Sequence, residues 1–160
     1  MKKILWPLML GLIICMGYFN SQLVEGGAGI VTFEFADKLE GKEILKRWAD
    51  TPLKDGGNLI NIARSHTYWD FAFILVYTGL LMVYSYDGSR STHGSLSHLL
   101  RLNVFVAFMA GGMDALENIQ MLQSFEQPYV FQETYWITVF KFSLISWVMI
   151  WWLVGRKWGV

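Results

Sequence analysis

Four long apolar segments constrain the fold of this chain more than any other feature of its sequence. A helix of roughly 20 apolar residues is needed to cross the hydrocarbon core of a bilayer. The segments that meet this requirement run over Ile4–Val24, Tyr68–Tyr86, Leu99–Leu122 and Tyr135–Val154. They predict an all-α, polytopic membrane protein in which residues 1–160 form a single domain, a bundle of four transmembrane helices. The second helix is expected to begin early, near Asn58, and so to cover about 58–86.

The positions of the basic residues predict the orientation of the helices. Lysines and arginines are enriched in short segments on the cytoplasmic side of membrane proteins. Three such segments carry Lys2 and Lys3, Arg90 and Arg101, and Arg156 and Lys157, whereas the loop over 123–134 has acidic residues and no basic one. Both termini are therefore predicted to be cytoplasmic. The first segment follows Met1-Lys2-Lys3 as a signal peptide would, but no small-residue cleavage motif follows it, so we expect an uncleaved anchor.

The long connection between the first two helices is patterned like a helical hairpin. Val31, Phe35 and Leu39 recur at helical spacing, and Ile44, Leu45 and Trp48 form a second apolar stripe. Gly41 separates the two segments. The pattern predicts an amphipathic hairpin over about 29–50 on the outer face of the bundle. On this periodicity, Glu34 falls on the polar side of its helix and is expected to face solvent.

Several ionisable residues occur at similar depth inside the predicted spans. An unpaired charge in a bilayer is costly, so intramembrane ionisable residues generally face protein or water and are candidates for function. Asp114, Glu117 and Asn118 lie on one helical face, and Lys141 lies at a comparable depth in the fourth span. We expect Lys141 to lie opposite Asp114 or Glu117. The pair is either part of a working site or a structural contact that fixes helix register.

The neighbouring helical faces supply further candidates. His66, Asp70 and Tyr77 share a face of the second helix, although His66 is close enough to the membrane surface to be expected in contact with solvent. The predicted ligand-binding residues, all in the outer half of the bilayer, are Glu34, His66, Asp70, Tyr77, Asp114, Glu117, Asn118 and Lys141.

Composition and motifs exclude other classes of site. The formal net charge is zero, so no nucleic-acid partner is expected. The one cysteine, Cys15, cannot form an internal disulfide. His66, Asp70, Asp114 and Glu117 offer possible metal ligands, but no HExxH or ExxH pattern accompanies them, and Lys141 already supplies a positive charge. No metal and no cofactor are predicted.

Several strings in this chain resemble a family of small bacterial four-helix membrane proteins that has no assigned activity. They are G-I-V-T-F-E-F-A (Gly29–Ala36), W-D-F-A-F-I-L-V-Y (Trp69–Tyr77) and D-A-L-E-N (Asp114–Asn118), together with Trp48 and Lys141. The resemblance implies a bacterial plasma (inner) membrane location. It also favours as site residues Glu34, Asp70, Asp114, Glu117, Asn118 and Lys141. In size the chain is also similar to lipoprotein signal peptidase, but the N-x-x-D-R and F-N-x-A-D strings of that family are absent.

These features predict a binding or permeation protein rather than an enzyme. It would hold a membrane lipid, a small amphiphile or an ion at the charged pocket. One alternative is an intramembrane hydrolase or transferase in which Asp70 and Asp114 share acid and base roles. Another is a structural or assembly subunit that meets a partner membrane protein or forms a homo-oligomer.

Overall fold

Six helices make up most of the computed structural model, which describes residues 2–54, 56–127 and 129–158. Four of them are long and apolar enough to cross a membrane: α1 (Lys2–Glu25), α4 (Leu59–Ser91), α5 (Ser95–Ser124) and α6 (Tyr135–Trp158). Two short helices, α2 (Ile30–Glu34) and α3 (Lys38–Asp50), lie between the first two spans. The predicted all-α membrane fold is confirmed.

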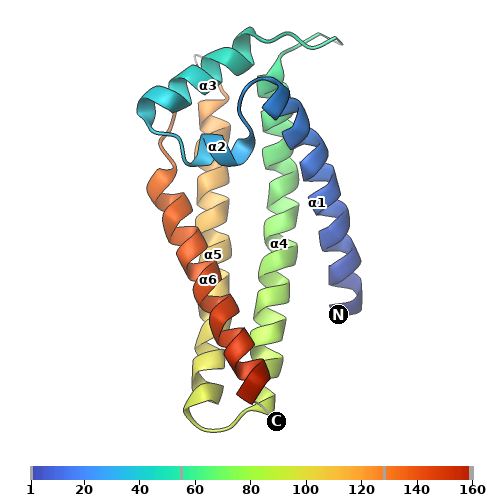
Figure 1. Ribbon diagram of the computed structural model, residues 1–160, viewed down its shortest axis with the longest axis vertical. Coiled ribbons are helices and arrows are strands. Elements are labelled where there is room, and N and C mark those ends of the chain that lie inside the picture. Colours follow the sequence, from blue (N-terminus) through green and yellow to red (C-terminus); the bar gives the residue numbers. More distant parts are fainter. Residues whose placement is uncertain (1, 55, 128, 159–160) are drawn as a thin grey trace.

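Helix α4 is the centre of the bundle (Figure 1). It packs extensively against α5 and α1, and less against α6, while α6 packs mainly on α5. Helices α1 and α6 barely contact each other although both lie beside α4. The bundle is therefore open between α1 and α6.

The spanning helices extend beyond the apolar segments that predicted them. Helix α4 contains 33 residues, which at about 1.5 Å per residue gives a length of about 50 Å. The hydrocarbon core is only about 30 Å thick. Hydropathy therefore marks the part of each helix that lipid surrounds and misses its polar ends. The turn between α4 and α5 is short and includes Gly94 at a φ of +64°.

Helices α2 and α3 form a cap over one end of the bundle (Figure 1). The prediction that the two segments divide at Gly41 was wrong. Helix α3 begins after Asp37, whose side chain accepts hydrogen bonds from the backbone N–H groups of Leu39 and Glu40 at 2.8 and 2.9 Å. Such N-capping satisfies donors at a helix start. Gly41 is instead buried inside α3, where a side chain would collide with the ring of Phe131.

A core of aromatic side chains holds the cap to the bundle. The ring centroid of Phe33 lies 5.1 Å from that of Trp48, 5.6 Å from Phe125 and 5.2 Å from Phe131. All four side chains are buried. This anchors α2 and α3 on α5 and on the segment before α6.

The apolar stripe predicted for the first hairpin segment faces outward, contrary to expectation. Val31, Phe35 and Leu39 are exposed, Leu39 by 76%. The chain leaves the helix after Glu34, so the spacing that continues to Leu39 does not describe one helical face. Phe35 stacks on Phe142 of α6, with a centroid separation of 5.9 Å. As a result α2 turns Phe33 and Glu34 inward.

Candidate functional site

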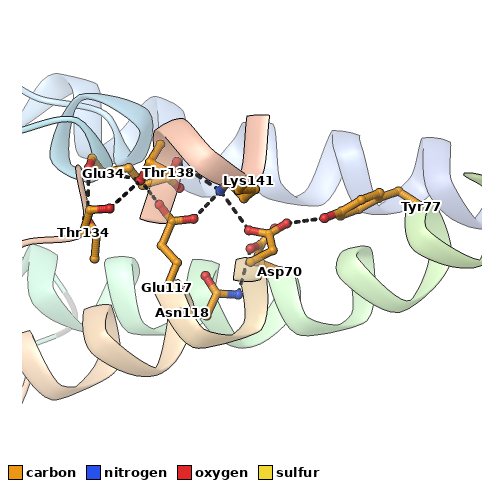
Figure 2. A network of polar contacts seen from close by, with 9 residues as sticks. Glu34, Asp70, Tyr77, Glu117, Asn118, Thr134, Thr138 and Lys141 are labelled. Carbon is orange, nitrogen blue, oxygen red and sulfur yellow. Dashed lines mark hydrogen bonds and ion pairs between the residues drawn. The ribbon is translucent and has the colours of Figure 1, made fainter. Parts of the chain in front are cut away.

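Lys141 of α6 is the centre of a buried charged cluster (Figure 2). Its Nζ donates to Asp114 Oδ1 at 2.8 Å and to Glu117 Oε2, both on α5. A third carboxyl oxygen, Glu34 Oε2, lies 3.7 Å from the same nitrogen. The sequence predicted one of the two α5 acids as the partner of Lys141, and the structure pairs it with both. The name charged cluster denotes Glu34, Asp70, Asp114, Glu117 and Lys141.

Helix α4 contributes an acid and a phenol to this arrangement. Tyr77 donates its hydroxyl to Asp114 Oδ2 at 2.7 Å. Asp70 Oδ2 accepts a hydrogen bond from the Asn118 side-chain amide at 2.8 Å. These contacts join the faces of α4 and α5 that sequence spacing had grouped, and they leave Asp70 with a neutral partner rather than a cationic one.

Glu34 belongs to the charged cluster, so the prediction that it faces solvent was wrong. The Thr134 hydroxyl donates to the Glu34 backbone carbonyl at 2.9 Å, which ties the end of α2 to the start of α6 (Figure 2). Thr138, one turn further along α6, donates its hydroxyl to Glu117. Burial raises the pKa of the Glu34 carboxyl from 4.5 to about 8, against the opposing attraction of the Lys141 ammonium. At neutral pH much of this group therefore carries its proton.

His66 is also buried, so the prediction that it contacts solvent was wrong. Only 4% of its surface is exposed. It lies one turn before Asp70 on α4, beside Ile30 and Glu34 of α2, with which it lines one cavity. Its Nδ1 has no hydrogen-bond partner among the described residues.

A cavity of about 560 Å³ extends from the charged cluster along α4. Its polar end is lined by Glu34, His66, Asp70, Asp114 and Lys141. The remainder is lined almost entirely by apolar and aromatic side chains of α1, α4 and α6. Because α1 and α6 barely contact each other, this cavity is a groove that opens sideways between them. We refer to it as the lateral groove.

Helix α1 forms one wall of the lateral groove, which the sequence did not lead us to expect. Asn20 lies near the polar end, and its Oδ1 accepts a hydrogen bond from the Ile30 backbone N–H at 2.9 Å. At the opposite end, Trp6 Nε1 donates to the Tyr84 hydroxyl at 2.7 Å. Asn20, a polar residue in an apolar helix, was the available signal for this wall. No signal was available for the apolar residues, whose groove-facing and lipid-facing positions look alike in sequence.

The charges of the cluster do not balance. The cluster holds four carboxyl groups and one ammonium; Glu34, Asp114 and Glu117 lie within 4 Å of Lys141 Nζ, and Glu117 is entirely buried. Buried charges in an apolar medium require a partner or a proton. Among the residues that the structure describes, no group of three or more His, Cys, Asp or Glu side chains is arranged to hold a metal ion. The arrangement is suited to binding a polar or charged group, or to exchanging protons.

No protein-family model matches the chain, and comparison with curated proteins and with solved structures likewise finds no match. Membership in the family of small bacterial four-helix membrane proteins that the sequence resembles therefore stays a prediction. What holds is that the chain is a multi-span membrane protein with a buried intramembrane charged cluster of Lys141 with Glu34, Asp114 and Glu117.

Proposed function

We propose that the protein binds an amphiphile, with its apolar tail in the lateral groove and its polar group at the charged cluster. The observation that carries this proposal is one continuous cavity with apolar walls and an ionisable end. Pockets that bind small molecules commonly combine apolar walls with a few convergent polar groups. The volume of about 560 Å³ lies within the range of about 300–1,000 Å³ usual for such sites.

The shape of the groove supports an elongated occupant. The α4 residues that line it run from His66 to Tyr84, a distance of about 27 Å along the helix. That length approaches the roughly 30 Å thickness of the hydrocarbon core. The same volume spread over this length is a narrow trough rather than a round chamber. A hydrocarbon tail entering between α1 and α6 from the surrounding lipid would fit it.

The proposal includes a location. In a bacterial plasma membrane with both chain termini in the cytoplasm, the cap would lie at the outer surface and the charged cluster in the outer half of the bilayer. An amphiphile of the outer leaflet would then reach the groove without crossing the membrane. Reaction of a membrane-impermeant thiol reagent with single cysteines introduced into the cap, in intact cells, tests this orientation.

Filling the groove tests the binding itself. Gly17 of α1 lines the groove, and a Cβ atom built there meets nothing within 4 Å. Gly17→Trp therefore adds bulk to the groove without a clash at the first side-chain atom. Gly11 is equally unobstructed, lies on the same helix and does not line the groove, so Gly11→Trp is the matched control.

The readout is lipid or amphiphile retained by the purified protein, measured by native mass spectrometry. We expect Gly17→Trp to lose the bound species and Gly11→Trp to keep it. Equal retention by both variants, or none by the wild type under any lipid composition, would refute amphiphile binding in this groove.

A second candidate, an intramembrane hydrolase or transferase, is favoured by one observation: Asp70 and Asp114 both line the same groove. Shared acid and base roles would require both carboxyls to face one substrate position in this groove. Incubating the protein with bilayer lipids and analysing the products separates the two candidates. Products that form with wild type and vanish with Asp70→Asn favour the enzyme, and unchanged lipids favour binding alone.

A further inference from the structure

We propose that the polar group bound at the charged cluster is a cationic amine, so that the occupant of the lateral groove is an alkylamine or an amine-bearing lipid. This inference rests on the proposed function and specifies its ligand. Three observations carry it: the arrangement of charges, a buried histidine whose Nδ1 has no hydrogen-bond partner among the described residues, and the aromatic walls beside them.

The acids that line the groove outnumber its cations. Lys141 donates to Asp114 and Glu117, and Glu34 is its more distant neighbour at 3.7 Å. Asp70 lines the groove and accepts a hydrogen bond from the neutral amide of Asn118 rather than from a cation. An anionic head group would add negative charge to this end and would be repelled. An ammonium would pair with the carboxylate of Asp70, because buried charges are stable only when paired.

His66 gives a second, independent indication of a ligand. It lines the same end of the groove, is only 4% exposed, and leaves Nδ1 without a partner among the described residues. Buried polar atoms are hydrogen-bonded in the great majority of cases, so an unpaired one calls for an explanation. In the tautomer that carries its proton on Nε2, Nδ1 is an acceptor, and a turn of the ring toward the groove would offer it to an ammonium N–H.

Aromatic rings line the groove next to these acids. Phe73 and Tyr77 pack with a centroid separation of 5.3 Å, and both line the groove on α4. Phe142 lines it from α6, and its ring already lies 4.9 Å from Lys141 Nζ. Aromatic faces attract ammonium groups, most strongly where water is excluded. The polar end thus combines carboxylates, a hydrogen-bond acceptor and rings, a set that suits an amine.

Probes that share one tail and differ in head group test the inference. Dodecylamine, dodecanol and dodecyl phosphate are titrated into the protein in phosphatidylcholine nanodiscs at neutral pH, with empty nanodiscs correcting for partition into lipid. We expect dodecylamine to bind at least about tenfold more tightly than dodecanol, because one charge-assisted hydrogen bond contributes that much affinity. Dodecyl phosphate should bind most weakly.

The outcomes separate this inference from the proposed function. If no probe binds, both fail. If all three bind equally, or the phosphate binds most tightly, the groove takes amphiphiles but the assignment of an amine is wrong. Repeating the dodecylamine titration in phosphatidylethanolamine and phosphatidylglycerol nanodiscs identifies the source of the amine: competition by phosphatidylethanolamine alone indicates a lipid head group, and its absence indicates a free alkylamine.

Removing the charge of Asp70 tests whether this residue is responsible for the preference for an amine. Asp70→Asn keeps the size of the side chain and can still hydrogen-bond Asn118, so we expect the variant to fold and to bind dodecylamine no better than dodecanol. Asp50→Asn, on the exposed surface of α3, is the matched control and should keep the preference. An Asp70→Asn variant that melts like wild type and keeps the full preference for the amine would contradict the assignment.

Discussion

Replacing Lys141 by methionine tests the physical basis of the charged cluster. Methionine retains most of the length of lysine and removes only the positive charge and its hydrogen bonds. The side chain of Lys141 is 6% exposed and the side chain of Glu117 is not exposed at all. The variant therefore leaves Asp114 and Glu117, which lay in contact with the ammonium, without any counter-charge in an apolar region.

The expected loss derives from these contacts. Two hydrogen bonds between charged groups disappear, and each contributes about 1.5–3 kcal/mol. Removing one partner of a buried ion pair costs about 3–5 kcal/mol in proteins, because the remaining charge stays buried. We therefore expect Lys141→Met to lower the free energy of unfolding by about 3–5 kcal/mol, a value reduced where Asp114 or Glu117 takes up a proton.

Unfolding by dodecyl sulfate in mixed micelles, followed by circular dichroism, measures this change. Lys46→Met, on the exposed surface of α3, is the control and should change stability by less than about 0.5 kcal/mol. Adding Glu117→Gln to Lys141→Met should recover part of the loss, giving a coupling energy of about 0.5–3 kcal/mol. A Lys141→Met variant as stable as Lys46→Met would show that the ammonium does not stabilise the bundle, and the reasoning would fail.

Three further predictions concern stability in the same assay. The folded protein binds the Glu34 proton more tightly than the unfolded chain does. The free energy of unfolding should therefore fall as pH rises from 4.5 to about 8. Glu34→Gln should flatten this dependence, and an unchanged slope would exclude Glu34 as its source. Gly41→Ala should cost about 1–3 kcal/mol because the buried ring of Phe131 blocks its methyl group, whereas Gly112→Ala, which meets nothing within 4 Å, should be neutral or stabilising. Thr134→Val removes the hydroxyl that holds the Glu34 carbonyl and should cost about 1–3 kcal/mol; a cost near zero would mean that this bond does not anchor α2.

The spans and the pairing of charges were accessible from sequence because the bilayer allows few alternatives. A long apolar run must be a helix when no water is present to satisfy its backbone. Acids at helical spacing on α5 share a face with no need for tertiary information, and a basic residue at similar depth on α6 is their natural partner. Lys141, Asp114 and Glu117 were predicted together for this reason.

The positions of Glu34 and His66 were decided by tertiary structure alone. Both were expected to contact solvent, Glu34 from the polar side of its helix and His66 from its place near the membrane surface. The aromatic core of Phe33 and its neighbours instead fixes the cap over the bundle, which turns Glu34 toward Lys141 and covers His66. These contacts join residues far apart in the chain, so no local pattern encodes them.

The lateral groove likewise exists only in the folded bundle. Apart from Asn20 and its polar ends, helix α1 is apolar on every side, and its sequence does not distinguish apolar positions that face the groove from those that face lipid. The groove arises because α1 packs on α4 and leaves the neighbouring side of α6 uncovered. The relative placement of these helices decides this. Sequence determined that the chain spans a membrane and buries charges, since the bilayer enforces both. Packing alone determined that those charges lie at the end of an open trough, because helix placement depends on the sum of many side-chain contacts.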